Sequence, residues 1–222
     1  MKPALVSFDL DGTLVDTAAE IAEALNRCLD EFGLPSRPRC QIENLIGRGA
    51  HALVSAVLAQ AEGDGAHRPP AAHVLARFDA HYADVIGAIS TAYPGAHDAL
   101  EMLGAHGLRL ACVTNKEGVH ARGLLQRHGL RPLLDLVVCG DSLPRRKPDA
   151  SVLRTVASFL GAPPEALIHV GDSAIDVMTA RNAGVRAWAV PHGYNGGRPI
   201  AEAGPDAIHP DLLSVARAAL AA

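Results

Sequence analysis

Two carboxylates stand at the end of an apolar run near the start of the chain, where Asp9 and Asp11 are followed by Gly12 and Thr13. Residues two apart on a strand point the same way, so both carboxylates can face one space just past the strand. Paired carboxylates suit a Mg²⁺ ion, and they suit a division of labour between a nucleophile and a general acid. The alternative is purely structural, with a turn at Asp11-Gly12-Thr13 before a helix and Asp9 as a solvated strand end.

Three further groups of polar residues follow apolar runs later in the chain. They are Thr114 with Asn115, then Lys147, then Asp172 with Asp176. Each group has a structural alternative, because these residue types also begin helices. If the apolar runs are parallel strands, their carboxyl ends lie along one edge of a sheet. A nucleophile, a hydroxyl donor, a cation and further carboxylates would then meet in one crevice.

The elements that must hold these residues follow an α/β pattern. The run 4–8 is almost continuously apolar, which is typical of a strand covered on both faces of a parallel sheet. From residue 96 onward the pattern alternates between helix and strand, which predicts a parallel sheet with helices on both faces. The expected helices are 96–105, 118–128, 149–160, 174–183 and 212–220, and the expected strands are 108–113, 134–139, 167–170, 185–190 and the short edge 207–208.

The region between the first strand and this alternation has a different pattern. From Thr17 apolar residues recur at helical spacing, and Gly33 can close that helix. A longer helix is expected from 74 to 86, and 61–70 is expected to be a surface loop. We therefore predict two parts, a core made of 1–16 with 91–222 and an all-helical insert over 17–90.

Composition narrows the class of partner. The formal net charge is -4 and no block of like charges occurs, so we expect no nucleic-acid partner. No apolar stretch approaches the ~20 residues of a membrane span, and the start does not resemble a signal peptide, so we expect a cytoplasmic protein. The chain has 17 arginines and only three lysines, which makes the interior lysines, Lys116 and Lys147, unusual. Partners should be small molecules.

Together these residues resemble the four motifs of the haloacid dehalogenase superfamily. The resemblance covers essentially the whole chain, and it implies a Rossmann-like, doubly wound parallel sheet with an inserted all-helical cap. Softer matches at 15–17, 46–49, 93–95 and 193–195 look like the phosphoglycolate phosphatase branch. The matching motifs are Asp9-Leu10-Asp11-Gly12-Thr13, Thr114-Asn115, Lys147-Pro148 and Gly171-Asp172-Ser173-Ala174-Ile175-Asp176.

The resemblance implies a mechanism in two steps through an aspartyl-phosphate. Asp9 would attack phosphorus, and Asp11 would protonate the leaving alkoxide and then activate water. Mg²⁺ would be held by Asp9, by the backbone carbonyl of Asp11 and by Asp172. Asp176 would orient the site or reach the metal through water. The phosphoryl oxygens would be held by a second set of groups, namely the side chains of Thr114 and Lys147 and the backbone amides near Leu10 and Asn115.

The resemblance also implies a substrate, a small phosphorylated metabolite, with 2-phosphoglycolate expected. The alternatives are a β-phosphoglucomutase-like phosphomutase, a phosphatase for pyrophosphate or an amino-sugar phosphate, and a binding protein without catalytic activity. The complete set of carboxylates argues against the last. Arg48 either faces the substrate from the cap, where it would bind a carboxylate, or is a solvated side chain. The protein is expected to be a monomer or a homodimer.

Overall fold

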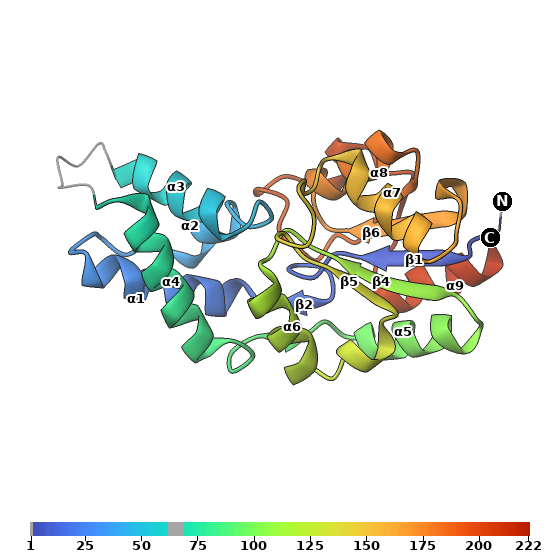
Figure 1. The fold of residues 1–222 in the computed structure, drawn as a ribbon, viewed down its shortest axis with the longest axis horizontal. Helices are drawn as coiled ribbons and strands as arrows, with labels where there is room; N and C mark the ends of the chain where they lie inside the picture. Colours follow the sequence, from blue (N-terminus) through green and yellow to red (C-terminus); the bar gives the residue numbers. More distant parts are fainter. Residues whose placement is uncertain (1, 62–68) are drawn as a thin grey trace.

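A six-stranded parallel sheet forms the centre of the computed structural model, which describes residues 2–61 and 69–222 (Figure 1). The strand order is β5-β4-β1-β6-β7-β8, so β1 lies inside the sheet with all four of its residues buried. This burial explains why its sequence is almost continuously apolar. The strands are β1 (Leu5–Phe8), β4 (Arg109–Val113), β5 (Leu136–Val138), β6 (Leu167–Gly171), β7 (Arg186–Ala189) and β8 (Ala207–Ile208).

The register of β1 aligns the ends of three strands. Phe8 pairs with Cys112 of β4 on one side and with Val170 of β6 on the other. The residues that follow these strands therefore begin at the same height along the edge of the sheet. This alignment brings the polar groups after β1, β4 and β6 to one place.

Helices cover both faces of the sheet, and alternate residues of β1 face each layer. Val6 and Phe8 join the apolar cluster that contains Leu100 of α5, whereas Leu5 joins the cluster that contains Leu153 of α7. Helices α5, α6 and α9 lie below the sheet in Figure 1, and α7 and α8 lie above it. These helices are α5 (Ala96–Ala105), α6 (Gly118–Arg127), α7 (Ala150–Phe159), α8 (Ala174–Ala183) and α9 (Leu212–Ala221), with short 3₁₀ turns at Arg131–Leu133, Pro164–Ala166 and Ile200–Ala203.

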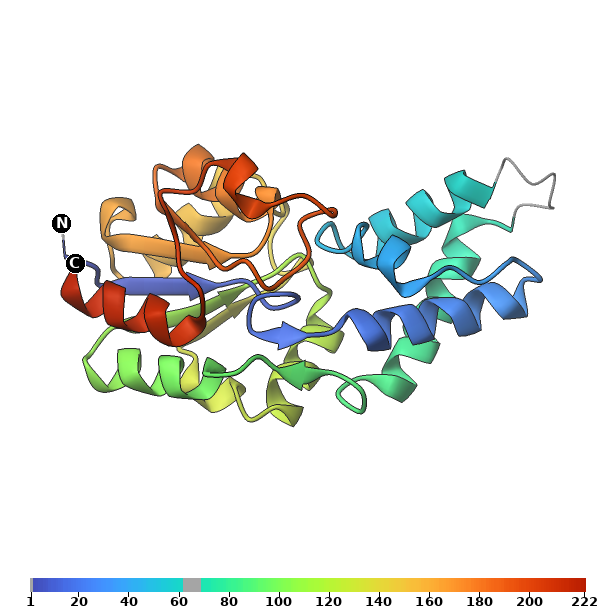
Figure 2. The same ribbon diagram turned by 180° about the vertical axis from the view of Figure 1, so that it is seen from behind.

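Four more helices form a separate group beyond the carboxyl edge of the sheet, as Figure 2 shows. Helix α1 packs along α4, where the Cys28 thiol donates to the carbonyl oxygen of Val74 at 3.2 Å. Two chain crossings join this group to the sheet, and there Val15 of β2 pairs antiparallel with Ala92 of β3. The elements are α1 (Ala18–Glu31), α2 (Arg39–Glu43), α3 (Ala50–Ala61), α4 (Ala71–Val85), β2 (Val15–Asp16) and β3 (Thr91–Ala92).

The predicted fold class, a doubly wound parallel sheet with a helical cap, is confirmed. Within 17–90 the described residues form helices and turns, and the two-residue strands β2 and β3 flank this region. That pair was not predicted, because two residues carry no periodicity. The expected strand 134–139 is shorter, at Leu136–Val138. Most of the expected loop 61–70 lies outside the described residues, and the exact domain boundaries stay a prediction.

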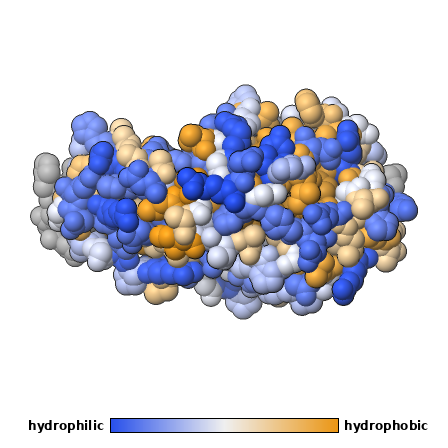
Figure 3. Space-filling model, turned by 90° about the horizontal axis from the view of Figure 1, so that it is seen from below, coloured by the Kyte–Doolittle hydropathy of each residue, from blue (hydrophilic) through white to orange (hydrophobic). Residues whose placement is uncertain are grey.

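Hydrophilic and hydrophobic residues are interspersed over the face of the molecule seen in Figure 3. Among the described residues, no helix combines the length and the apolar character that crossing a membrane requires.

Candidate active site

Lys147 joins two of the predicted carboxylates. Its Nζ lies 2.8 Å from Asp9 Oδ1 and 2.7 Å from Asp176 Oδ1. Asp172 completes the group, since one oxygen from each of the three carboxylates lies within 4.8 Å of the others. All four side chains are buried. The structure thus brings these four predicted residues into a single site at the carboxyl ends of β1 and β6.

Burial and neighbouring charge shift the pKa values of this group in opposite directions. Burial raises the pKa of Asp9 to about 7, against the opposing charge of Lys147. Burial also acts to raise the pKa of Asp176, but Lys147 and His169 hold it below its usual value. The two carboxylates in turn outweigh burial and raise the pKa of Lys147. Lys147 therefore stays cationic, and Asp176 holds its negative charge more firmly than Asp9.

Asp176 has every oxygen occupied by protein donors. Its Oδ1 accepts from Lys147 and contacts His169 Nε2 at 3.3 Å. Its Oδ2 accepts the Ser173 hydroxyl at 2.6 Å. It also accepts the Ser173 backbone N–H at 3.1 Å, which is part of the capping box at the start of α8. Asp176 is thus a residue that fixes Lys147 in place.

In the part of the chain that the structure describes, the donors to Asp172 are neutral groups. The Thr13 hydroxyl donates to its Oδ1 at 2.7 Å, and the Tyr194 backbone N–H donates to its Oδ2 at 2.6 Å. The chain comes very close on that side, because a Cβ on Gly193 would lie 2.3 Å from Asp172 Oδ2. Burial, and then the charges of Asp176 and Asp9, raise the pKa of Asp172 well above its usual value.

The donor set fits a divalent cation with hard oxygen ligands. Asp9 and Asp172 are buried carboxylates that lie near each other, and like charges in such a setting are unfavourable unless a cation compensates them. Lys147 supplies one positive charge, but it contacts Asp9 and Asp176 rather than Asp172. A cation such as Mg²⁺ between Asp9 and Asp172 would satisfy oxygen atoms that the protein leaves with too little positive charge.

Asp11 lies at the edge of a pocket next to this group. Its Oδ1 accepts from the Thr17 hydroxyl at 2.7 Å and from Lys116 Nζ at 2.9 Å. Neither partner was assigned a function from the sequence. The rarity of lysine in this chain was the one signal that could have identified Lys116.

Three more predicted residues, Leu10, Thr114 and Asn115, either contact Asp9 or line the same pocket. The backbone N–H of Leu10 donates to Asp9 Oδ1 at 2.7 Å. The Thr114 hydroxyl accepts the Lys116 backbone N–H at 3.1 Å, and Thr114 lines the pocket. Asn115 donates through Nδ2 to the carbonyl oxygens of Gly47 and Lys147, both at 3.0 Å. It therefore links a loop of the helical cap to the core.

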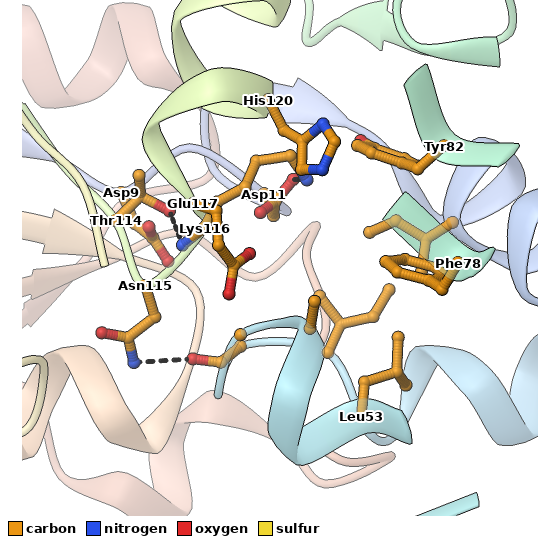
Figure 4. Close-up of a pocket in the computed structure, with 15 residues that line it drawn as sticks. Asp9, Asp11, Leu53, Phe78, Tyr82, Thr114, Asn115, Lys116, Glu117 and His120 are labelled. Atoms are coloured by element: carbon orange, nitrogen blue, oxygen red, sulfur yellow. Dashed lines mark hydrogen bonds and ion pairs between the residues drawn. The ribbon is translucent and has the colours of Figure 1, made fainter. Parts of the chain in front are cut away.

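The pocket lies between the core and the helical cap (Figure 4). It has a volume of about 490 Å³, including space open to solvent. Its core wall is polar, and its cap wall is largely apolar. Core residues on the wall include Asp9, Asp11, Thr114, Asn115, Lys116, Glu117 and His120, and cap residues include Ile21, Ile46, Ala50, Leu53, Phe78 and Tyr82.

Arg48 is not among the residues that line this pocket, although Gly47 and Gly49 on either side of it are. Its exposed side chain borders a neighbouring hollow, together with Asn44, Ser173 and Asn195. Of the two roles considered for Arg48, this position agrees with a solvated side chain.

Tyr194 connects the site to the base of the cap. Its hydroxyl donates to Asp16, and it accepts the backbone N–H groups of Thr17 at 2.9 Å and Ala18 at 3.1 Å. Its own backbone N–H holds Asp172. The sequence pointed to Tyr194 only as part of a short motif, because the partners of its hydroxyl lie more than 170 residues away in the chain.

Comparison with known proteins agrees with this geometry. The family model described as haloacid dehalogenase-like hydrolase matches residues 6–190. A phosphoglycolate phosphatase of Cupriavidus necator, described as plasmid, is 42% identical over 223 residues, which cover 98% of this chain and 96% of that protein. Phosphoglycolate phosphatase 1 of Pseudomonas aeruginosa is 40% identical, with 95% of this chain and 77% of that protein covered.

A solved structure is similar over nearly the whole chain. The crystal structure of a predicted phosphoglycolate phosphatase from Haemophilus somnus superimposes with a TM-score of 0.95 at 30% identity, and 98% of each chain is covered.

Proposed function

The chain belongs to the haloacid dehalogenase-like hydrolase family and is a phosphoric monoester hydrolase, and we propose that it hydrolyses 2-phosphoglycolate to glycolate and phosphate. The substrate rests on the relatives that carry this name at about 40% identity over most of the chain. The chemistry rests on one observation, which is the position of Lys147 between Asp9 and Asp176 with Asp172 beside them.

Asp9 is the proposed nucleophile. One of its oxygens attacks phosphorus, and the bond from phosphorus to the ester oxygen breaks as the bond to Asp9 forms. Lys147 and the Leu10 N–H both contact Asp9 Oδ1 and orient the carboxylate, and the charge of Lys147 opposes the rise in the pKa of Asp9 that burial causes. Lys147, the Thr114 hydroxyl and the amides near Leu10 and Asn115 would then hold the phosphoryl oxygens.

Asp11 is the proposed acid and base. Its proton goes to the leaving alkoxide in the first step, which releases glycolate. In the second step Asp11 takes a proton from water as that water attacks phosphorus, and Asp9 is regenerated with release of phosphate. Thr17 and Lys116 hold the carboxylate of Asp11 at the pocket edge.

We propose that Asp9, the backbone carbonyl of Asp11 and Asp172 hold Mg²⁺, whose use is typical of the family. The ion supplies positive charge that lets an anionic nucleophile approach an anionic ester. Asp176 would orient the site, because its oxygens are already used by Lys147, His169 and Ser173.

A panel of phosphate esters tests the proposed function. Purified protein with Mg²⁺ is assayed on 2-phosphoglycolate, pyrophosphate, an amino-sugar phosphate and a sugar 1-phosphate. We expect the highest kcat/KM for 2-phosphoglycolate, and an Asp9→Asn variant should lose activity on every substrate. Equal rates of the two proteins would refute the enzyme mechanism, and an isomerised sugar phosphate would favour a phosphomutase. The cytoplasmic location and the choice between monomer and homodimer stay predictions.

A further inference from the structure

Lys116 is a buried lysine whose ammonium group is paired with one carboxylate. It follows β4 and is 7% exposed, and its Nζ contacts Asp11 Oδ1 at 2.9 Å. Lys147, by comparison, divides its charge between two carboxylates. An ammonium group has three donors, and Lys116 Nζ has one carboxylate partner among the described residues. Lys116 therefore retains capacity to bind a second anion.

The aromatic ring of Tyr82 covers this ammonium group. Lys116 Nζ lies 4.5 Å from the ring centroid, within the range of a cation–π contact. Figure 4 shows Lys116, Asp11 and Tyr82 together at one side of the pocket. Tyr82 belongs to the cap and Lys116 to the core, so the lysine is held where the two parts meet.

The described cap residues that line the pocket include no lysine or arginine. Among the described residues that line the pocket, Lys116 is the only lysine or arginine. The cap residues beside it, including Leu53 and Phe78, are apolar and cannot balance a negative charge. An anionic group that enters this pocket on the side away from Lys147 thus has one fixed counter-ion available.

Because Lys116 contacts Asp11, its ammonium group lies near the place where the leaving oxygen of the substrate would be protonated. In 2-phosphoglycolate one carbon separates the leaving oxygen from the carboxylate. If Asp11 protonates that oxygen, the carboxylate lies within reach of the ammonium group already bound to Asp11. We propose that Lys116 binds the carboxylate of the substrate and so selects esters with an anionic group beside the leaving oxygen. This inference rests on the proposed function and assigns the residue that recognises its substrate.

Tyr82 is a positioning residue in this arrangement. Its hydroxyl donates to Glu20 Oε1 at 2.6 Å, and Glu20 is completely buried. The His120 ring packs against the Tyr82 ring at 4.9 Å in an edge-on arrangement. Both contacts fix the ring that holds the ammonium group of Lys116, so the cap places the cation without touching the reacting atoms.

A pair of inhibitors measures this recognition without relying on turnover. 3-Phosphonopropionate is the carbon analogue of 2-phosphoglycolate, and propylphosphonate has a methyl group in place of the carboxylate. Their affinities for the Mg²⁺-loaded protein are measured by titration calorimetry. We expect the natural protein to bind the carboxylated compound about 10–100-fold more tightly, as for a buried charged hydrogen bond.

Substitutions then assign the preference to residues. Lys116→Gln should bring the affinity ratio close to one, whereas Lys2→Gln, at an exposed lysine, should leave it unchanged. Tyr82→Leu should reduce the ratio strongly, and Tyr82→Phe should reduce it less, because the ring and its His120 contact remain while the hydroxyl bond to Glu20 is lost. The Tyr82 pair also tests the inference if Lys116→Gln does not fold.

The outcomes separate the two proposals. A natural protein with no preference for the carboxylated compound would contradict the proposed substrate, and this inference with it. A preference that persists in Lys116→Gln would refute the role of Lys116 alone and leave the substrate standing. An equal loss of affinity for both compounds would also refute it, since Lys116 would then act only through the general structure of the site.

Discussion

Lys147 Nζ lies 2.7 Å from Asp176 Oδ1, and this buried ion pair holds the lysine against the nucleophile candidate Asp9. The two residues are 29 positions apart in the chain and follow different strands. Asp176 is fixed in turn by Ser173 at the start of α8. The charge beside Asp9 is thus positioned by a helix cap.

Replacing Lys147 tests this arrangement. Lys147→Met leaves Asp9 and Asp176 buried without their cation, so we expect kcat/KM to fall by about 10²–10³-fold. The free energy of unfolding should fall by about 3–5 kcal/mol, as when one partner of a buried pair is removed. Enzyme assays and urea unfolding measure the two effects. Arg145→Met, at an exposed neighbour, serves as the control, and a Lys147→Met enzyme as active as this control would contradict the prediction.

Replacing Asp172 with asparagine should raise the stability of the metal-free protein and lower its activity. Without metal, its buried charge lies near two other carboxylates, so Asp172→Asn should raise the melting temperature of the metal-free protein. Each kcal/mol gained corresponds to about 2–4 °C for a chain of this size. The asparagine can still accept from the Tyr194 N–H and donate to Thr13.

The same Asp172→Asn variant should lose activity and should no longer be stabilised by added Mg²⁺. Thermal melts with and without Mg²⁺, preceded by chelator treatment, measure this linkage. The natural protein is the control, and its melting temperature should rise with Mg²⁺. An equal rise in the variant would show that Asp172 is not a ligand.

Gly193 is expected to tolerate no side chain. A Cβ there would lie 2.3 Å from both Asp172 Oδ2 and the carbonyl oxygen of Gly12. Gly193→Ala should therefore displace Asp172, raise the Mg²⁺ concentration for half-maximal activity by about 10–100-fold and cost about 1–3 kcal/mol of stability. Gly104→Ala is the matched control, because its nearest neighbour would lie 3.8 Å away. Similar Mg²⁺ dependence in both variants would contradict this account.

Glu20 stabilises the junction between cap and core. It is completely buried, and it accepts the Tyr82 hydroxyl and the backbone N–H groups of Gly87 at 2.8 Å and Ser90 at 3.3 Å. Glu20→Ala leaves these donors without a partner, at about 1–3 kcal/mol for each donor that water does not reach. Equilibrium urea unfolding should show the loss, whereas Glu23→Ala, one turn further along the same helix, should change stability little. If Glu20→Ala lowers the free energy of unfolding no more than Glu23→Ala does, water must satisfy the donors that Glu20 accepts in the natural protein.

The sequence by itself determined the α/β alternation and the residue types at each strand end. Apolar runs of four to six residues can be read locally, because burial on both faces of a sheet leaves a continuous apolar pattern. The polar residues that interrupt these runs, Asp9, Thr114 and Asp172, stand out for the same reason. The short pair β2 and β3 has no such pattern and was found only in the structure.

Only the tertiary structure decided which of the polar residues at the strand ends are in contact with one another. The strand order sets β4 and β6 on either side of β1, and that order has no local signature in the sequence. For the same reason the contacts of Lys116 with Asp11 and Tyr82, and of Glu20 with Tyr82, could not be predicted. Arg48 is a further example, since its motif left open whether it faces the substrate or solvent, and the fold places its exposed side chain beside a neighbouring hollow. Side-chain contacts between distant segments depend on packing, which a pattern along one chain does not encode.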